Sequence, residues 1–137
     1  MRAVLDTNVL ISGVIATGVP HDVLVAGFDG SYDLVASVET LAEFRETLRK
    51  YPDRFGMSDS EIRREVETVR YFAEFVDPDL DIAAVSADPD DDKFVEAAVA
   101  GDVAYLISGD QHLLDLDEFR GVDIVTPRTF YERLDSD

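Results

Sequence analysis

The chain of 137 residues contains no cysteine and only two lysines, Lys50 and Lys93. Without cysteine it can form no disulfide, no thiolate zinc site and no cysteine nucleophile, which leaves oxygen ligands and hard cations as its metal chemistry. His21 and His112 are the only histidines, too few to build a zinc site by themselves.

Long hydrophobic runs are also missing. No apolar stretch approaches the roughly 20 residues that cross a bilayer, and the segment Met1–Asp6 is too short and too soon acidic for a signal peptide. We therefore expect a cytoplasmic protein with no membrane partner. With 46% hydrophobic residues, the chain is long enough for one domain over residues 1–137, with Asp135–Asp137 as a frayed tail.

The formal net charge is −18. Taken alone, this argues against a polyanionic partner, because phosphate contacts normally come from lysine and arginine. The acidic residues are spread through segments with regular apolar spacing, however, as expected for a protein kept soluble at very high salt. There the Debye length falls to about 3 Å, and repulsion of RNA is screened. A halophilic source is therefore our hypothesis.

Short apolar runs alternate with longer segments of helical period, which is typical of a parallel sheet with helical crossovers. The predicted class is α/β. The predicted strands are Arg2–Leu5, Leu34–Ala36, Phe75–Val76, Tyr105–Ile107 and Val122–Val125. The predicted helices are Pro20–Phe28, one from the N-cap Ser37 to about Lys50, one that opens at Ser58–Glu61, and one that opens at Asp88–Asp91. Residues Tyr51–Met57 are the expected surface loop.

Acidic residues follow two of these strands. Asp6 ends the first strand and Asp110 follows the fourth, while Glu43 and Asp92 lie early in helices that can reach the same edge of the sheet. In an open parallel sheet, ligands bind beyond the C-terminal ends of the strands, so residues far apart in sequence can converge there. Such a cluster lowers the stability of the folded protein, because like charges repel and raise one another's pKa. A bound divalent cation removes this repulsion.

Each carboxylate also has a purely structural interpretation. Asp6 or Asp110 taken singly caps a following helix about as readily as it binds an ion. Asp92 has two acidic neighbours that stabilise a helix N-terminus, and Glu43 shares a polar helix face with Glu39 and Glu46. His112 is expected on a helix surface. The four acids together point to a metal site more strongly than any one of them.

Four stretches of the chain resemble the PIN-domain nucleases, in particular the VapC-like toxin branch of type II toxin–antitoxin systems. They are Val4–Leu10, Ser37–Phe44, Asp88–Ala98 and Ala104–Asp110 with Leu113–Leu114 behind it. The resemblance implies a three-layer α/β/α PIN-like domain with a central parallel sheet of four to five strands. It also implies an endoribonuclease that uses one or two Mg²⁺ or Mn²⁺ ions, in which a water activated by metal attacks an RNA phosphodiester.

Carried over by position, the family's catalytic and metal-binding acids fall on Asp6, Glu43, Asp92 and Asp110, with Asp91 as the alternative ligand. Supporting roles around the metal fall on Asn8, Ser108 and Glu96. The implied partners are RNA, a cognate antitoxin and a second copy of the chain. A dimer face could use Ile62, Val66, Val69 and Leu24, but core packing explains them equally well. Arginines of the Glu43 helix and beyond it could hold RNA or lie on a solvated surface: Arg45, Arg49, Arg54, Arg63 and Arg64.

Other functions remain open. A PIN domain of RNA processing or quality control has the same residues as a toxin, and a catalytically silent α/β binding module needs none of them. A phosphorelay receiver would have a carboxylate pair after its first strand, where Asp6 is followed by Thr7 and Asn8. A haloacid-dehalogenase-like phosphatase needs a second aspartate two positions after the first, where this chain has Asn8.

Overall fold

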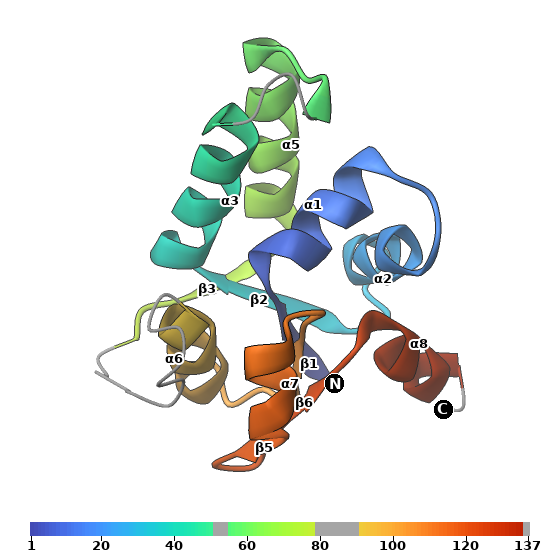
Figure 1. Ribbon diagram of the computed structural model, residues 1–137, viewed down its shortest axis with the longest axis vertical. Helices are drawn as coiled ribbons and strands as arrows, with labels where there is room; N and C mark the ends of the chain where they lie inside the picture. The colour runs from blue at the N-terminus through green and yellow to red at the C-terminus, as the bar shows by residue number, and fades with distance from the viewer. Residues whose placement is uncertain (51–54, 79–90, 136–137) are drawn as a thin grey trace.

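The computed structural model of the protein describes residues 1–50, 55–78 and 91–135 (Figure 1). Four expectations lie wholly or partly outside these residues: the start of the Tyr51–Met57 loop, the role of Arg54, the helix opening at Asp88–Asp90, and the end of the tail. The described elements are β1 (Arg2–Leu5), α1 (Thr7–Ile15), α2 (Val19–Phe28), β2 (Asp33–Ser37), α3 (Val38–Lys50), α5 (Asp59–Phe72), β3 (Glu74–Val76), α6 (Asp92–Ala100), β4 (Tyr105–Ile107), α7 (Gln111–Leu116), β5 (Glu118–Phe119), β6 (Val122–Val125) and α8 (Pro127–Asp135).

These strands form one six-stranded sheet in the order β3-β2-β1-β4-β6-β5. All neighbouring pairs are parallel except the pair of β5 and β6, which is antiparallel. The predicted α/β class and all five predicted strands are confirmed. The additional strand β5 has two residues, too few for a recognisable pattern, and it extends the predicted sheet at its edge.

Helices cover both faces of this sheet and make three layers (Figure 1). Ala3 and Leu5 of β1 face a core formed with α1, α2, α3, α5 and α8, whereas Val4 between them faces a second core formed with α6 and α7. The alternation follows from the strand's period of two, and it explains why β1 is apolar throughout. Ile62, Val66, Val69 and Leu24 are buried in the first core, so core packing accounts for these four residues.

Side chains near the helix N-termini explain where several helices begin. Ser58 and Glu61 form a reciprocal capping box at the start of α5, as the sequence predicts. Ser37 Oγ accepts a hydrogen bond of 3.1 Å from the Thr40 amide and caps α3. The sequence patterns did not single out α1 or α8. Helix α1 is hydrophobic around most of its surface and has little amphipathic pattern, because it packs between α2, α3 and the sheet.

The strand order places a topological switch point at the centre of the sheet. Strand β1 lies between β2 and β4, so the chain leaves β1 toward one edge and later returns through β4 toward the other. Open parallel sheets bind ligands in the crevice outside the C-terminal ends of two such strands. The residues directly after β1 and β4 are Asp6 and Ser108.

Within the described ranges, no single helix is long and apolar enough to cross a membrane. Helices α1 and α2 reach that length and apolar composition only when taken together, and the pair is bent by 94°.

Candidate active site

A cavity of about 230 Å³ opens at the C-terminal edge of β1 and β4. Four of its lining residues are acidic, and they come from four separate parts of the chain. The lining consists of Asp6, Thr7, Asn8, Glu43, Thr47, Asp91, Phe94 and Asp110. The predicted convergence of acids from distant segments on this edge is therefore present in the structure.

Asp6 lies deepest, and its side chain is held on both oxygens. Its residue is 4% exposed. Oδ1 accepts a hydrogen bond of 2.9 Å from the Val9 amide and thereby caps α1, and Oδ2 accepts one from the Ser108 hydroxyl. Burial raises the pKa of Asp6, the two hydrogen bonds oppose that rise, and the nearby carboxylates of Asp110 and Glu43 add to it.

Ser108 joins the ends of the two central strands. Its hydroxyl donates to Asp6 Oδ2, and its oxygen accepts a hydrogen bond of 2.9 Å from the Asp110 amide. The residue is fully buried. Ser108 therefore fixes the separation of Asp6 and Asp110, the kind of supporting role that the sequence resemblance implies for it.

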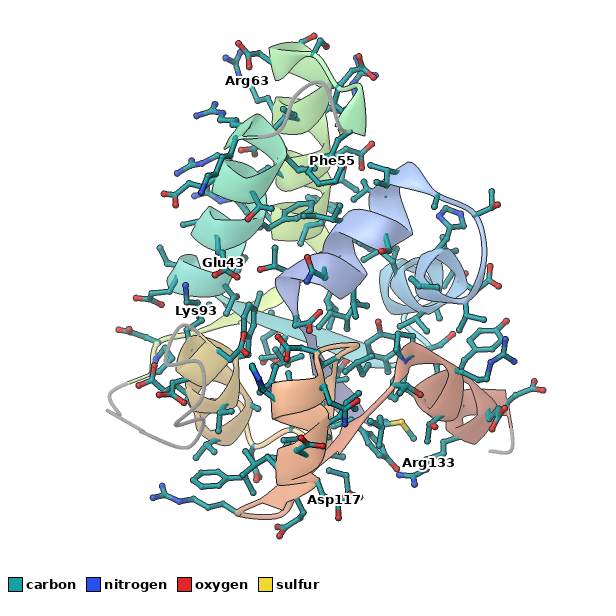
Figure 2. All side chains as sticks on the ribbon, in the orientation of Figure 1. Glu43, Phe55, Arg63, Lys93, Asp117 and Arg133 are labelled. Carbon is teal, nitrogen blue, oxygen red and sulfur yellow. The ribbon has the colours of Figure 1, made fainter. Side chains whose placement is uncertain are left out.

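Glu43, in the second turn of α3, is also engaged on both oxygens. Oε2 accepts a hydrogen bond from the Thr7 hydroxyl, and Oε1 lies 2.9 Å from the Lys93 ammonium nitrogen. Figure 2 shows Glu43 and Lys93 on the neighbouring helices α3 and α6. Their side chains are 28% and 27% exposed, so this ion pair is less screened than one at the open surface.

Asp110 also lines the cavity, and its side chain is partly exposed. Its Oδ1 caps the short helix α7 by accepting a hydrogen bond of 2.8 Å from the His112 amide, and His112 Nδ1 lies 3.8 Å from the same oxygen. One potential ligand atom each from Asp91, Asp110 and His112 lies within 4.8 Å of the other two. His112 is exposed, as predicted for a helix surface, but it also stands beside the acids.

Of the adjacent acids at the start of α6, Asp91 lines the cavity, whereas Asp92 is absent from the lining. Asp91 occupies the N-cap position of α6 without a side-chain cap hydrogen bond, and its Oδ2 is shielded from solvent. This difference follows from where α6 begins. Because Asp92 is the first residue of the helix, Asp91 precedes it at the N-cap and is the acid that lines the cavity. Glu96 is half-buried one turn along α6 and is also absent from the lining.

Three residues that contact the acids of the cavity are not among the predicted site residues: Thr7, Lys93 and His112. Thr7 follows Asp6 directly, and a hydroxyl beside a strand-end acid is a usable signal. Lys93 is one of only two lysines and lies in an acidic run. The signal for His112 was its position two residues after Asp110. Asn8, which was predicted, is exposed at the edge of the cavity.

The described part of the chain also has larger hollows elsewhere. One of about 400 Å³ lies between α2 and α8, and one of about 320 Å³ is lined by residues of α3, α5 and β3. The second is mainly apolar, with Val38, Leu41, Val66 and Phe75 in its lining. Neither gathers carboxylates from several strand ends, so we place the candidate active site in the smaller acidic cavity, where the strand topology also points.

The donors in this cavity suit a hard divalent cation. Carboxylate oxygens are the ligands that Mg²⁺ and Mn²⁺ prefer, and a cavity open on one side leaves room for water and a phosphate oxygen. Burial raises the pKa of Asp6, and Asp110 and Glu43 add to this rise, so its ionised form is disfavoured without metal and a nearby cation would favour it.

Comparison with known proteins points the same way. A family model described as "PIN domain" matches residues 2–112 of the chain. The crystal structure of PAE2754 from Pyrobaculum aerophilum is similar in fold, with a TM-score of 0.66 and 19% sequence identity, over 100% of this chain and 91% of that chain. No curated protein matches the chain.

Proposed function

The chain belongs to the PIN-domain family, and from that premise we propose that it is a metal-dependent endoribonuclease that hydrolyses RNA phosphodiester bonds. PIN domains are generally nucleases, which gives the reaction class. The observation that carries the proposal is the meeting of Asp6, Glu43, Asp91 and Asp110 around one cavity. A cluster of carboxylates that is open to solvent on one side is suited to holding a divalent ion against a phosphate.

The proposed cofactor is Mg²⁺ or Mn²⁺, held by Asp6, Glu43, Asp110 and one acid at the start of α6. Asp91 takes that fourth place here because it lines the cavity, and Asp92 is the alternative. When bound, such an ion activates water and balances negative charge on the phosphoryl group. No covalent enzyme intermediate is required.

The chain's own residues hold this arrangement in place. Val9 and Ser108 fix the two oxygens of Asp6, and the Thr7 hydroxyl fixes Glu43. Asn8 is exposed at the edge of the cavity, where its amide can donate a hydrogen bond to a phosphate oxygen. Orientation of this kind lowers the barrier because the ligands need not reorganise during the reaction.

The protein as a whole is strongly acidic, but helices α3 and α5 carry basic groups that RNA phosphates could contact. Arg45, Arg49, Arg63 and Arg64 are exposed on these two helices, which lie side by side (Figure 1), and Figure 2 labels Arg63 near their far end. Helix α3 also carries Glu43. We assign these arginines the phosphate contacts, and high salt reduces the repulsion from the acidic surface.

We further propose that the protein is the toxin of a toxin–antitoxin pair and acts as a homodimer in the cytoplasm. The support is the resemblance of its motif stretches to VapC-like toxins. In addition, helices α3 and α5 and strand β3 each carry exposed apolar side chains, with Val38 70% and Tyr71 82% exposed. To test the toxin role, the native chain is expressed in a host: growth should stop, and co-expression of the antitoxin should restore it. To test the homodimer, the molar mass is measured by light scattering, and Tyr71→Asp should weaken dimerisation.

The direct test is an RNA-cleavage assay at high salt with Mg²⁺ or Mn²⁺. It compares the native chain with Asp6→Asn and Asp110→Asn. We expect both variants to lose at least about 100-fold in cleavage rate, since each removes a charged ligand, and a chelator to abolish cleavage by the native chain. Glu61→Gln, on the distant capping box of α5, is the matched control and should cleave normally. Native-like cleavage by either site variant, with circular dichroism showing a folded protein, would refute the proposal.

A further inference from the structure

Lys93 is in an unusual place for a lysine. It is the second residue of α6, where the positive end of the helix dipole disfavours a cation. It is one of two lysines in a chain of 137 residues, and it directly follows three aspartates, Asp90 to Asp92. Helix formation therefore does not explain it, and its contact with Glu43 does.

The Lys93 ammonium pairs with Glu43 Oε1 at 2.9 Å, and Thr7 donates to the other oxygen. Both oxygens of Glu43 are thus engaged from within the protein. In addition, ligand atoms of Asp91, Asp110 and His112 lie within 4.8 Å of one another. Glu43 thus already has a positive partner, whereas Asp91, Asp110 and His112 bring donors together for an ion.

The charges on the cavity wall sharpen this contrast. Four carboxyl groups line the cavity, and the Lys93 ammonium offsets one of the four negative charges that they carry when all are ionised. One divalent ion then leaves a single negative charge, whereas a second ion would make the site positive and would have to displace the ammonium group. In the absence of Lys93, two divalent ions would neutralise the four carboxylates.

We propose that Lys93 is a built-in counter-cation that pairs with one oxygen of Glu43 and limits the site to one divalent ion per chain. This inference rests on the proposed metal-dependent function and deepens it. Lys93 does not replace the catalytic ion, since its ammonium has no open coordination position. Its role is to position Glu43 and to keep the acidic cavity folded before metal arrives.

The test counts Mn²⁺ ions bound to the full chain by electron paramagnetic resonance of free Mn²⁺ and by titration calorimetry. We expect one ion for the native chain and two for Lys93→Met, with the second ion binding at least about tenfold more tightly than any second ion in the native chain. Lys93→Arg keeps the positive charge and should bind one ion. Lys50→Met, the change at the other lysine, should also bind one.

Each other outcome has a defined meaning. Two ions in the native chain, one ion in Lys93→Met, or two in Lys93→Arg would overturn the role of Lys93 while leaving metal binding intact. Unchanged stoichiometry in Lys93→Met with a raised KM for RNA would instead make Lys93 a phosphate contact. No binding of Mn²⁺ by the native chain would refute the proposed function itself. Circular dichroism checks folding, and Lys93→Gln replaces Lys93→Met if the latter does not fold.

Discussion

At the N-termini of α1 and α5 a carboxylate accepts a hydrogen bond from a backbone amide, but its pKa is raised at α1 and lowered at α5. At α1 the buried Asp6 caps the helix by accepting from the Val9 amide, and burial raises its pKa. At α5 the exposed Glu61 accepts from the Ser58 amide in a capping box, and that hydrogen bond lowers its pKa. The same kind of contact therefore stabilises the charge in one place and only partly offsets desolvation in the other.

This contrast separates structural acids from functional ones. Glu61 does what its local sequence predicts, and its ionised form favours folding. Asp6 does the same local work but is also placed beside Asp110 and Glu43, where its ionised form disfavours folding of the metal-free protein. A protein that keeps such an arrangement holds a site that a cation would stabilise.

The largest effect that we predict concerns the start of α6, where the distinction between structural and functional acids can be tested on two adjacent aspartates. Asp91 occupies the N-cap position without capping the helix, and it lines the cavity. If its role is functional, as for Asp6, Asp91→Asn should lower Mn²⁺ affinity by about 10- to 100-fold, while Asp92→Asn should change it by less than about threefold. Titration calorimetry measures both. A larger loss in Asp92→Asn would move the ligand to Asp92 and show that Asp91 only begins the helix.

How far the sequence predicts the molecule differs between the sheet and the site. The apolar runs predict the five main strands because a buried parallel strand has to be apolar on both faces. The helix start at Ser58 follows from its capping-box pattern. Strand β5 and helix α1 were beyond such patterns, the first because it has two residues and the second because it is hydrophobic around most of its surface.

Within the site, strand ends could be predicted and helix ends could not. Asp6 and Asp110 follow strands whose limits are plain, so their convergence follows from the parallel topology. The choice between Asp91 and Asp92 depends on one residue at the start of α6, and helix boundaries are the least certain part of a sequence-based prediction. The ion pair of Lys93 with Glu43 joins residues 50 positions apart, and only the packing of α6 against α3 reveals it.

The comparison of the two helix N-termini also predicts opposite signs for stability at neutral pH without metal. Asp6→Asn removes a buried charge and keeps a cap acceptor, so it should raise the thermal midpoint. Ser58→Ala removes a cap and should cost about 1 kcal/mol, which lowers the midpoint by about 3–5 °C. Differential scanning calorimetry at one fixed salt concentration measures both. A fall of the midpoint in Asp6→Asn would mean that its carboxylate stabilises the metal-free fold.

The smallest expected effect is in the pH dependence of the same two sites. Because the folded pKa of Asp6 is raised, its cost to the metal-free protein appears as pH rises above the unfolded value of 3.8 and through the folded pKa. Because the folded pKa of Glu61 is lowered, its contribution is present above 4.5 and is lost as pH falls through the folded pKa. Relative to the native chain, Asp6→Asn should therefore gain stability as pH rises, and Glu61→Gln should lose stability over the same direction. Urea unfolding at a series of pH values from acid to neutral gives both differences, and parallel curves for the two variants would mean that the two carboxylates are equivalent.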